Sequence, residues 1–73
     1  MVKVLIHIDG GIIRSITSDD PVDVYVIDYD TEGVENDHPF LTTFDGDECL
    51  LGREEPRIDP GLVNLALKTW NSI

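Results

Sequence analysis

Residues 22–29, VDVYVIDY, alternate between two sets of side chains. Successive side chains of an extended strand point to opposite faces, so three valines fall on one face and Tyr25, Ile27 and Tyr29 on the other. We therefore predict a strand that is buried on its valine face. The two tyrosines and Ile27 indicate that its second face is also partly covered.

Upstream, residues 2–8 (VKVLIHI) are rich in β-branched residues and predict another strand. The triplet DGG at residues 9–11 supplies glycines for a tight turn, because glycine adopts positive φ without strain. We expect residues 12–17 (IIRSIT) to pair back as the second arm of a β-hairpin. The loop length, two or three residues, is left open. A turn at residues 18–21 (SDDP) follows.

Downstream, residues 30–39 (DTEGVENDHP) are polar and acidic, which is typical of a loop. Residues 40–44 (FLTTF) and 49–53 (CLLGR) then flank the sequence DGDE at residues 45–48. Aspartate followed by glycine between two apolar segments favours a second β-hairpin.

The last segment predicts a helix. Asp59 is a suitable N-cap residue, and Pro60 stands at the first helical position, where its missing N–H is not needed. Six apolar residues then fall within an arc of about 140° at helical spacing, and we call them the helix stripe: Leu62, Val63, Ala66, Leu67, Trp70 and Ile73. We expect this helix to lie against the sheet, with Trp70 as a core anchor. Because tryptophan is also favoured at interfaces, the alternative is that part of the helix packs across a homodimer. The sequence thus predicts one small α+β domain, residues 1–73, in which a helix packs on an antiparallel sheet of two hairpins and a third strand.

The chain has 73 residues, of which 41% are hydrophobic and 27% charged, so one small folded domain is expected. A compact chain of this size exposes about 4,500 Å² and buries roughly 60% of its unfolded surface. The net charge of −10 argues against direct binding of nucleic acid or an anionic membrane. No apolar run approaches the roughly 20 residues of a membrane span, and no signal peptide is recognised.

Cys49 is the single cysteine, so an internal disulfide is excluded and a reducing, cytoplasmic location is expected. Its apolar context favours a buried, unreactive thiol. His7 and His38 have no metal-ligand spacing to each other or to Cys49. We assign no catalytic, cofactor-binding or metal-ligating residue and expect no cofactor.

Fourteen of the fifteen acids lie between Asp19 and Asp59, where the only bases are Arg53 and Arg57. The plain interpretation is a solvated surface that keeps a small protein in solution. A second interpretation is a contact surface for a basic partner.

Asp28, Asp30 and Glu32 resemble the first half of a calcium loop, and Gly33 occupies its sixth position. The twelfth position, however, is Pro39 rather than glutamate. The hypothesis of a domain that responds weakly to a divalent cation or small ligand therefore rests on the Asp28, Asp30 and Glu32 carboxylates alone.

Residues 2–33, with the DGG turn and the strand end VIDYDTEG, and residues 58–63 (IDPGLV) resemble a group of short acidic bacterial proteins. The resemblance implies no activity, cofactor or site residue. The first functional hypothesis is therefore a non-enzymatic cytoplasmic module that binds another protein, either a basic partner or a second copy of itself, through acidic loops between Asp19 and Asp37. The cation-responsive domain is the alternative, and an enzyme would need a concave pocket with convergent polar groups.

Overall fold

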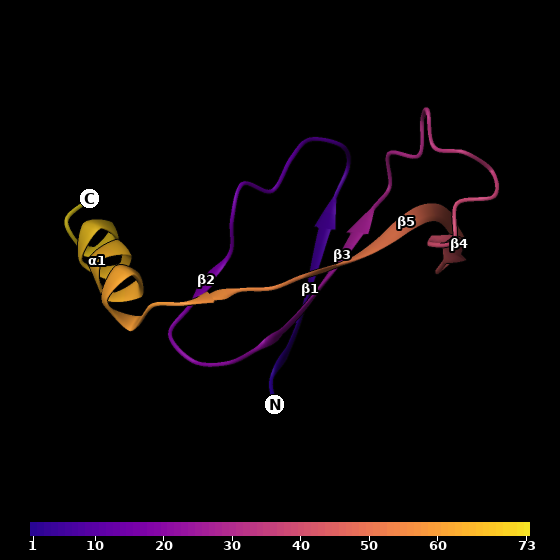
Figure 1. The fold of residues 1–73 in the computed structure, drawn as a ribbon. Coiled ribbons are helices and arrows are strands. Elements are labelled where there is room, and N and C mark those ends of the chain that lie inside the picture. Colours follow the sequence, from indigo (N-terminus) through magenta and orange to yellow (C-terminus); the bar gives the residue numbers. More distant parts are fainter.

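The computed structural model describes residues 1–73 and contains a four-stranded sheet, a two-stranded sheet and one helix (Figure 1). The predicted α+β class is therefore confirmed. The elements in chain order are β1 (Lys3–Ile8), β2 (Thr17–Ser18), β3 (Asp23–Asp28), β4 (Leu41–Phe44), β5 (Asp47–Glu54), β6 (Arg57–Ile58) and α1 (Pro60–Asn71).

Strand β3, from the VDVYVIDY stretch, lies inside the larger sheet, whose strand order is β1-β3-β5-β4. It pairs in parallel with β1 and antiparallel with β5. Both faces of β3 contribute to the core, because Val24 and Val26 are buried on one side and Ile27 on the other. With Cys49 of β5, these are the only four buried residues. The sheet is therefore mixed rather than antiparallel as expected.

The expected first hairpin is wrong. The glycines of the DGG turn do adopt positive φ, 81° at Gly10 and 88° at Gly11, but residues 12–16 form no strand. Strand β1 instead pairs with β3, which matches Val4 with Val24 and Ile6 with Val26. Pairing of β1 with β3 is more stable than pairing of β1 with residues 12–17. The first brings apolar side chains opposite each other, whereas the second would place Arg14 and Ser15 in the ladder. Residues 9–22 form the crossover that parallel strands need.

The second hairpin is confirmed. Asp45 and Gly46 form a two-residue loop with φ of 49° and 87°, and Phe44 pairs with Asp47. Positive φ at both loop residues is typical of the turn whose twist suits a hairpin. Strand β5 continues through Gly52 to Glu54, four residues beyond its pairing with β4.

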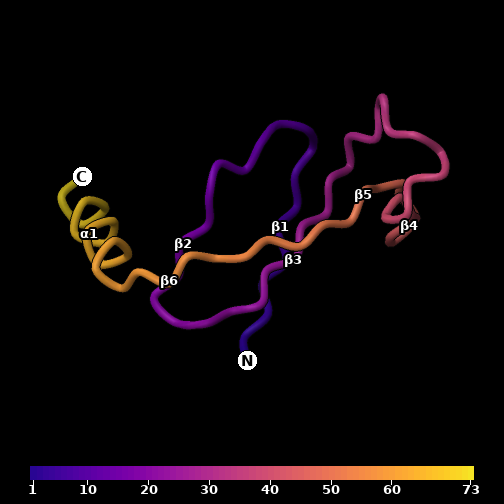
Figure 2. Tube along the Cα trace, in the orientation of Figure 1, coloured from indigo at the N-terminus to yellow at the C-terminus, as the bar shows by residue number.

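Helix α1 begins as predicted, since the Asp59 side chain accepts a hydrogen bond from the Leu62 N–H at 3.1 Å. The expectation that it packs on the sheet is wrong. No α1 residue is buried, and the helix contacts β2 but no strand of the larger sheet. Trp70, predicted as a core anchor, is 72% exposed. Figures 1 and 2 show α1 at one end of the molecule, with the four-stranded sheet at the other.

The short β2–β6 ladder accounts for this placement of the helix. Thr17 and Ser18 pair in parallel with Arg57 and Ile58. The Asp59 N–H continues the ladder by donating to the Ser18 carbonyl at 2.9 Å. The residue that caps the helix is therefore fixed to β2, away from the larger sheet.

The result is an elongated molecule of 44 × 28 × 20 Å. Its radius of gyration is 15.1 Å, whereas a compact chain of this length has about 11 Å. Its accessible surface of 5892 Å² exceeds the compact expectation by roughly 1,400 Å². The structure contains no helix with the length and apolarity needed to cross a bilayer.

Candidate functional site

The Asp28, Asp30 and Glu32 segment follows the carboxyl end of β3, beside the end of β1. Asp28 Oδ1 accepts hydrogen bonds from the backbone N–H groups of Gly10 and Asp30, both at 3.0 Å. Asp30 Oδ1 accepts one from the Glu32 N–H at 3.2 Å. Two of the three carboxylates that we considered as cation ligands therefore order the backbone. No group of three or more His, Cys, Asp or Glu side chains is placed to hold a metal ion.

His7 and Tyr29 form a hydrogen-bonded, stacked pair near this strand end. His7 Nδ1 lies 2.8 Å from the Tyr29 hydroxyl, and the two rings stack at a centroid distance of 5.9 Å with an interplanar angle of 11°. Burial raises the pKa of the Tyr29 phenol, and the negative charges of Asp47, Cys49 and Asp45 raise it further. The arrangement holds Tyr29 in its neutral form.

The other residues that could have formed a metal or nucleophilic site lie apart. His38 Nδ1 accepts a hydrogen bond from the Phe40 N–H at 3.1 Å, within its own loop. Cys49 is fully buried in β5, as its apolar sequence context predicted. Neither His7 nor His38 belongs with Cys49 to a group of three or more potential metal ligands.

The charge of the molecule is largely uncompensated. Only Asp23 and Asp59 lie within 4.0 Å of a basic nitrogen, through Arg53 at 3.2 Å and Arg57 at 3.3 Å. All fifteen acids and four of the five bases lie in residues 1–59, which carry a formal charge of −11. Residues 60–73 carry +1 from Lys68, which gives the total of −10. The helix is therefore an acid-free segment attached to a strongly acidic body.

A second candidate surface is apolar. The helix stripe is open to solvent along its length, with Leu62 45% exposed and Leu67 55% exposed in addition to Trp70. The larger sheet also exposes apolar side chains on the face that carries Ile27, because the ladder pairs Leu5 with Tyr25 and Ile27 with Leu51. We define the sheet patch as the exposed apolar residues of this face: Leu5, Tyr25, Phe44 and Leu51.

An open groove of about 390 Å³ adjoins the sheet patch. Phe40, Leu51, Gly52 and Arg53 line it. It lies where β5 extends past β4, so that residues 52–54 have no neighbouring strand on that side. The Arg53 guanidinium lies 5.7 Å from the centre of the Tyr25 ring and covers part of the patch. The groove and the sheet patch share Leu51. Charged side chains of the same face border them: Lys3, Asp23, Arg53 and Asp47.

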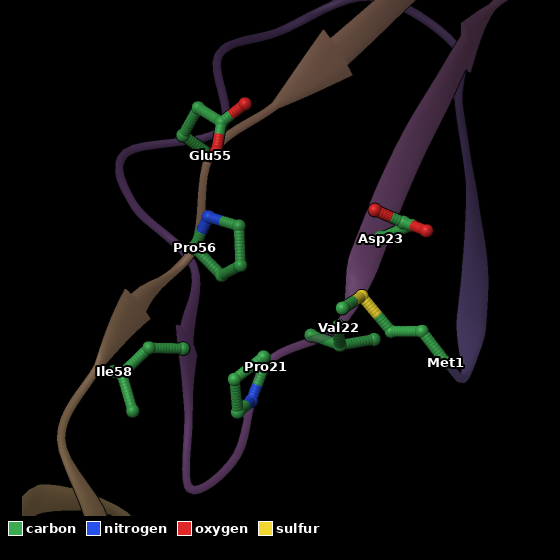
Figure 3. A pocket seen from close by; sticks show the side chains of 7 residues that line it. All are labelled: Met1, Pro21, Val22, Asp23, Glu55, Pro56 and Ile58. Atoms are coloured by element: carbon green, nitrogen blue, oxygen red, sulfur yellow. The ribbon is translucent and has the colours of Figure 1, made fainter.

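A smaller hollow of about 250 Å³ separates the two sheets. Its lining comes from the start of β3, the β5–β6 connection and the N-terminus. Figure 3 shows Pro21, Pro56 and Ile58 around the space, with Asp23 and Glu55 toward its upper end. The two sheets therefore leave a gap where they adjoin.

No protein-family model, curated protein or solved structure matches this chain. The helix stripe and the apolar strands were recognised in the sequence, but the helix was predicted to pack on the sheet of its own chain. Their exposure was missed because the β2–β6 ladder consists of two-residue strands, which have no recognisable sequence pattern.

Proposed function

We propose that this chain is a non-enzymatic cytoplasmic protein-interaction module, which acts by binding a second protein chain. The observation that supports this function best is that two separate apolar surfaces, the helix stripe and the sheet patch, both expose large apolar side chains to solvent. Apolar patches larger than a few hundred Å² are rare on monomers in solution and are typical of interaction sites. On this chain the helix stripe and its C-terminal end expose Leu62, Leu67, Trp70 and Ile73 at 45%, 55%, 72% and 94%.

The acidic loops between Asp19 and Asp37 give the module a second property. Acids in these loops, including Asp19, Glu35 and Asp37, are exposed, and none of the three is paired with a base. Uncompensated negative charge accelerates encounter with a basic surface and selects against acidic ones. A basic protein partner bound at these loops is the form of the proposal that this charge favours.

The two surfaces are tested together by affinity capture from lysate of the source organism, washed at low and then at high salt. The baits are the wild-type chain, a Trp70→Ala variant and a variant with both Glu35→Gln and Asp37→Asn. A partner lost from Trp70→Ala and retained at high salt identifies the apolar surface. A partner lost at high salt and from the charge variant identifies the acidic loops, because salt screens exposed charges.

An untagged copy of the chain is added to each capture, so that self-association is also scored. The proposed function fails if the wild-type bait retains neither another protein nor the added copy at either salt. The Asn71→Ala variant serves as the control for the helix, since it alters an exposed, uncharged position outside the helix stripe.

A further inference from the structure

We infer that the partner of the apolar surface is a second copy of this chain, and that the helix stripe of each copy covers the sheet patch of the other. This inference rests on the proposed function and names its partner. The chain carries both halves of a helix-on-sheet interface. The helix half has no buried residue, and the sheet half still exposes the side chains of the sheet patch around buried Ile27 and Cys49. In a two-fold dimer, the helix stripe of each copy would pack on the sheet patch of its partner, so the same contact would form twice.

The area available suits such a dimer. Each chain exposes roughly 1,400 Å² more than a compact chain of its mass. This excess belongs to the whole elongated chain, so about 2,800 Å² is the upper bound of what two copies could hide, compared with roughly 2,000–5,000 Å² in permanent homodimer interfaces. A smaller excess would support only a transient contact.

The dimensions of the two halves also match. Helix α1 has 12 residues, hence a length of about 18 Å. The six-residue strands β1 and β3 are about 20 Å long, and four adjacent strands span about 14 Å between their outer axes. One helix therefore covers the apolar part of the sheet with little overhang.

The helix cannot cover the sheet of its own chain in this conformation. The β2–β6 ladder and the Asp59 N–H bond to Ser18 fix its first turn beside the smaller sheet. Figure 1 shows the whole helix displaced from the four-stranded sheet. The exchange therefore needs no new fold, only a second copy.

The distribution of charge along the chain favours the helix as the element that is exchanged. Two bodies of charge −11 repel each other, but residues 60–73 carry no acid and one lysine. The helix is the segment that a second acidic body accepts without like-charge contact. Because the bodies still repel, added salt should strengthen the dimer, whereas it should weaken a complex with a basic partner.

The oligomeric state is measured by sedimentation over a dilution series at low and high salt, with the fluorescence of Trp70, the single tryptophan, as a second readout. We expect a dimer that tightens with salt and a blue-shifted Trp70 emission that moves red on dilution. Trp70→Ala should weaken the dimer about 30-fold, as expected for a central aromatic anchor. Asn71→Ala, outside the stripe, should leave it unchanged. Since Trp70 is largely exposed in the monomer, its loss does not threaten the fold.

The exchange itself is tested with a spin label that quenches tryptophan fluorescence. One chain carries Trp70→Phe and a nitroxide on Thr42→Cys, and it is mixed with the wild-type chain. Thr42 pairs with Cys49 and so lies on the face of the sheet patch, whereas its neighbour Thr43 pairs with Glu48 on the opposite face. The matched control carries the label on Thr43→Cys. Buried Cys49 does not compete for the label, which the unsubstituted Trp70→Phe chain verifies.

Because the labelled chain has no tryptophan, any quenching reports contact between copies. Strong quenching from position 42 and weak quenching from position 43 supports the exchange. A dimer with equal quenching from both positions overturns it and indicates another interface. A monomer at every concentration also overturns it, including one whose emission is blue at all dilutions because the helix folds back on its own sheet. Capture of a different protein would then leave the proposed function standing.

Discussion

The Asp28 carboxylate joins the ends of two parallel strands by accepting the Gly10 backbone N–H at 3.0 Å. The same oxygen accepts the Asp30 N–H at 3.0 Å, so one side chain orders both chain segments that leave the sheet. An acid that we considered as a cation ligand thus has a structural role.

Asp28→Ala should lower the free energy of unfolding by about 1–2 kcal/mol, since it leaves two backbone N–H groups without their acceptor. Asp28→Asn keeps an oxygen at the same position and should lose less than half as much. Urea unfolding of both variants measures the difference. Equal losses would mean that the negative charge, rather than the acceptor, stabilises this strand end.

Gly10→Ala and Gly11→Ala form a matched pair. Both residues have positive φ, which costs about 1–2 kcal/mol in a residue with a Cβ. A Cβ at Gly10 would also lie 2.9 Å from Asp30 Oδ2, whereas one at Gly11 meets nothing within 4 Å. Gly10→Ala should therefore be the more destabilising in chemical unfolding. Adding Asp30→Ala should remove the difference, and if the difference persisted, the clash would not be its cause.

Stability should fall in alkali through Tyr29. Its pKa is raised above the ordinary value of 10.0, so the folded chain holds the phenolic proton more tightly than the unfolded chain. The contribution of the Tyr29 proton to the free energy of unfolding is complete below pH 10, and it is lost as the pH rises through the raised pKa. Thermal unfolding followed from pH 8 to 11.5 should show a steeper decline for the wild-type chain than for Tyr29→Phe. Parallel curves would contradict the assignment.

The helix should depend on its cap. Asp59→Ala should cost about 1 kcal/mol of helix stability, because the Leu62 N–H loses its acceptor. An isolated helix of 12 residues is marginal in water, so the loss should appear as lower helical circular dichroism in dilute solution. Asp59→Asn retains a capping oxygen but not the ion pair with Arg57, and it should keep most of the helix. Equal loss in both variants would attribute the effect to the ion pair.

Calcium or magnesium at millimolar concentration should not raise the melting temperature beyond the effect of sodium chloride at equal ionic strength. The reason is that Asp28 and Asp30 already bind backbone N–H groups and no three ligands converge. A specific rise that Asp28→Asn abolishes would revive the cation-responsive alternative, since a ligand of the folded state stabilises it by mass action.

The elements with local signals could be predicted from the sequence. The Asp45–Gly46 turn and the Asp59–Pro60 start of the helix depend on residues within a few positions, and both are confirmed. The alternation of residues 22–29 likewise predicted β3. The burial of Cys49 followed from its apolar neighbours.

The errors concern partners far apart in sequence. The strand that pairs with β1 is chosen by apolar matches such as Val4 with Val24, which a turn motif at residues 9–11 does not encode. The position of α1 depends on Thr17 and Ser18 meeting Arg57 and Ile58, four residues with no strand pattern of their own. The sequence pattern could not show that the helix stripe is exposed, because this exposure follows from that pairing.

The β2–β6 ladder also bears on the order in which the chain folds. The β4–β5 hairpin joins neighbours in sequence, whereas Thr17 meets Arg57 only after a long loop has closed. Loop closure of this kind is slow and yields few contacts in return, so we expect this ladder to form last. The helix would then reach its final direction only once the larger sheet is complete. Early folding intermediates would lack the oriented helix, and the proposed pairing between chains would have to wait until each chain has nearly finished folding.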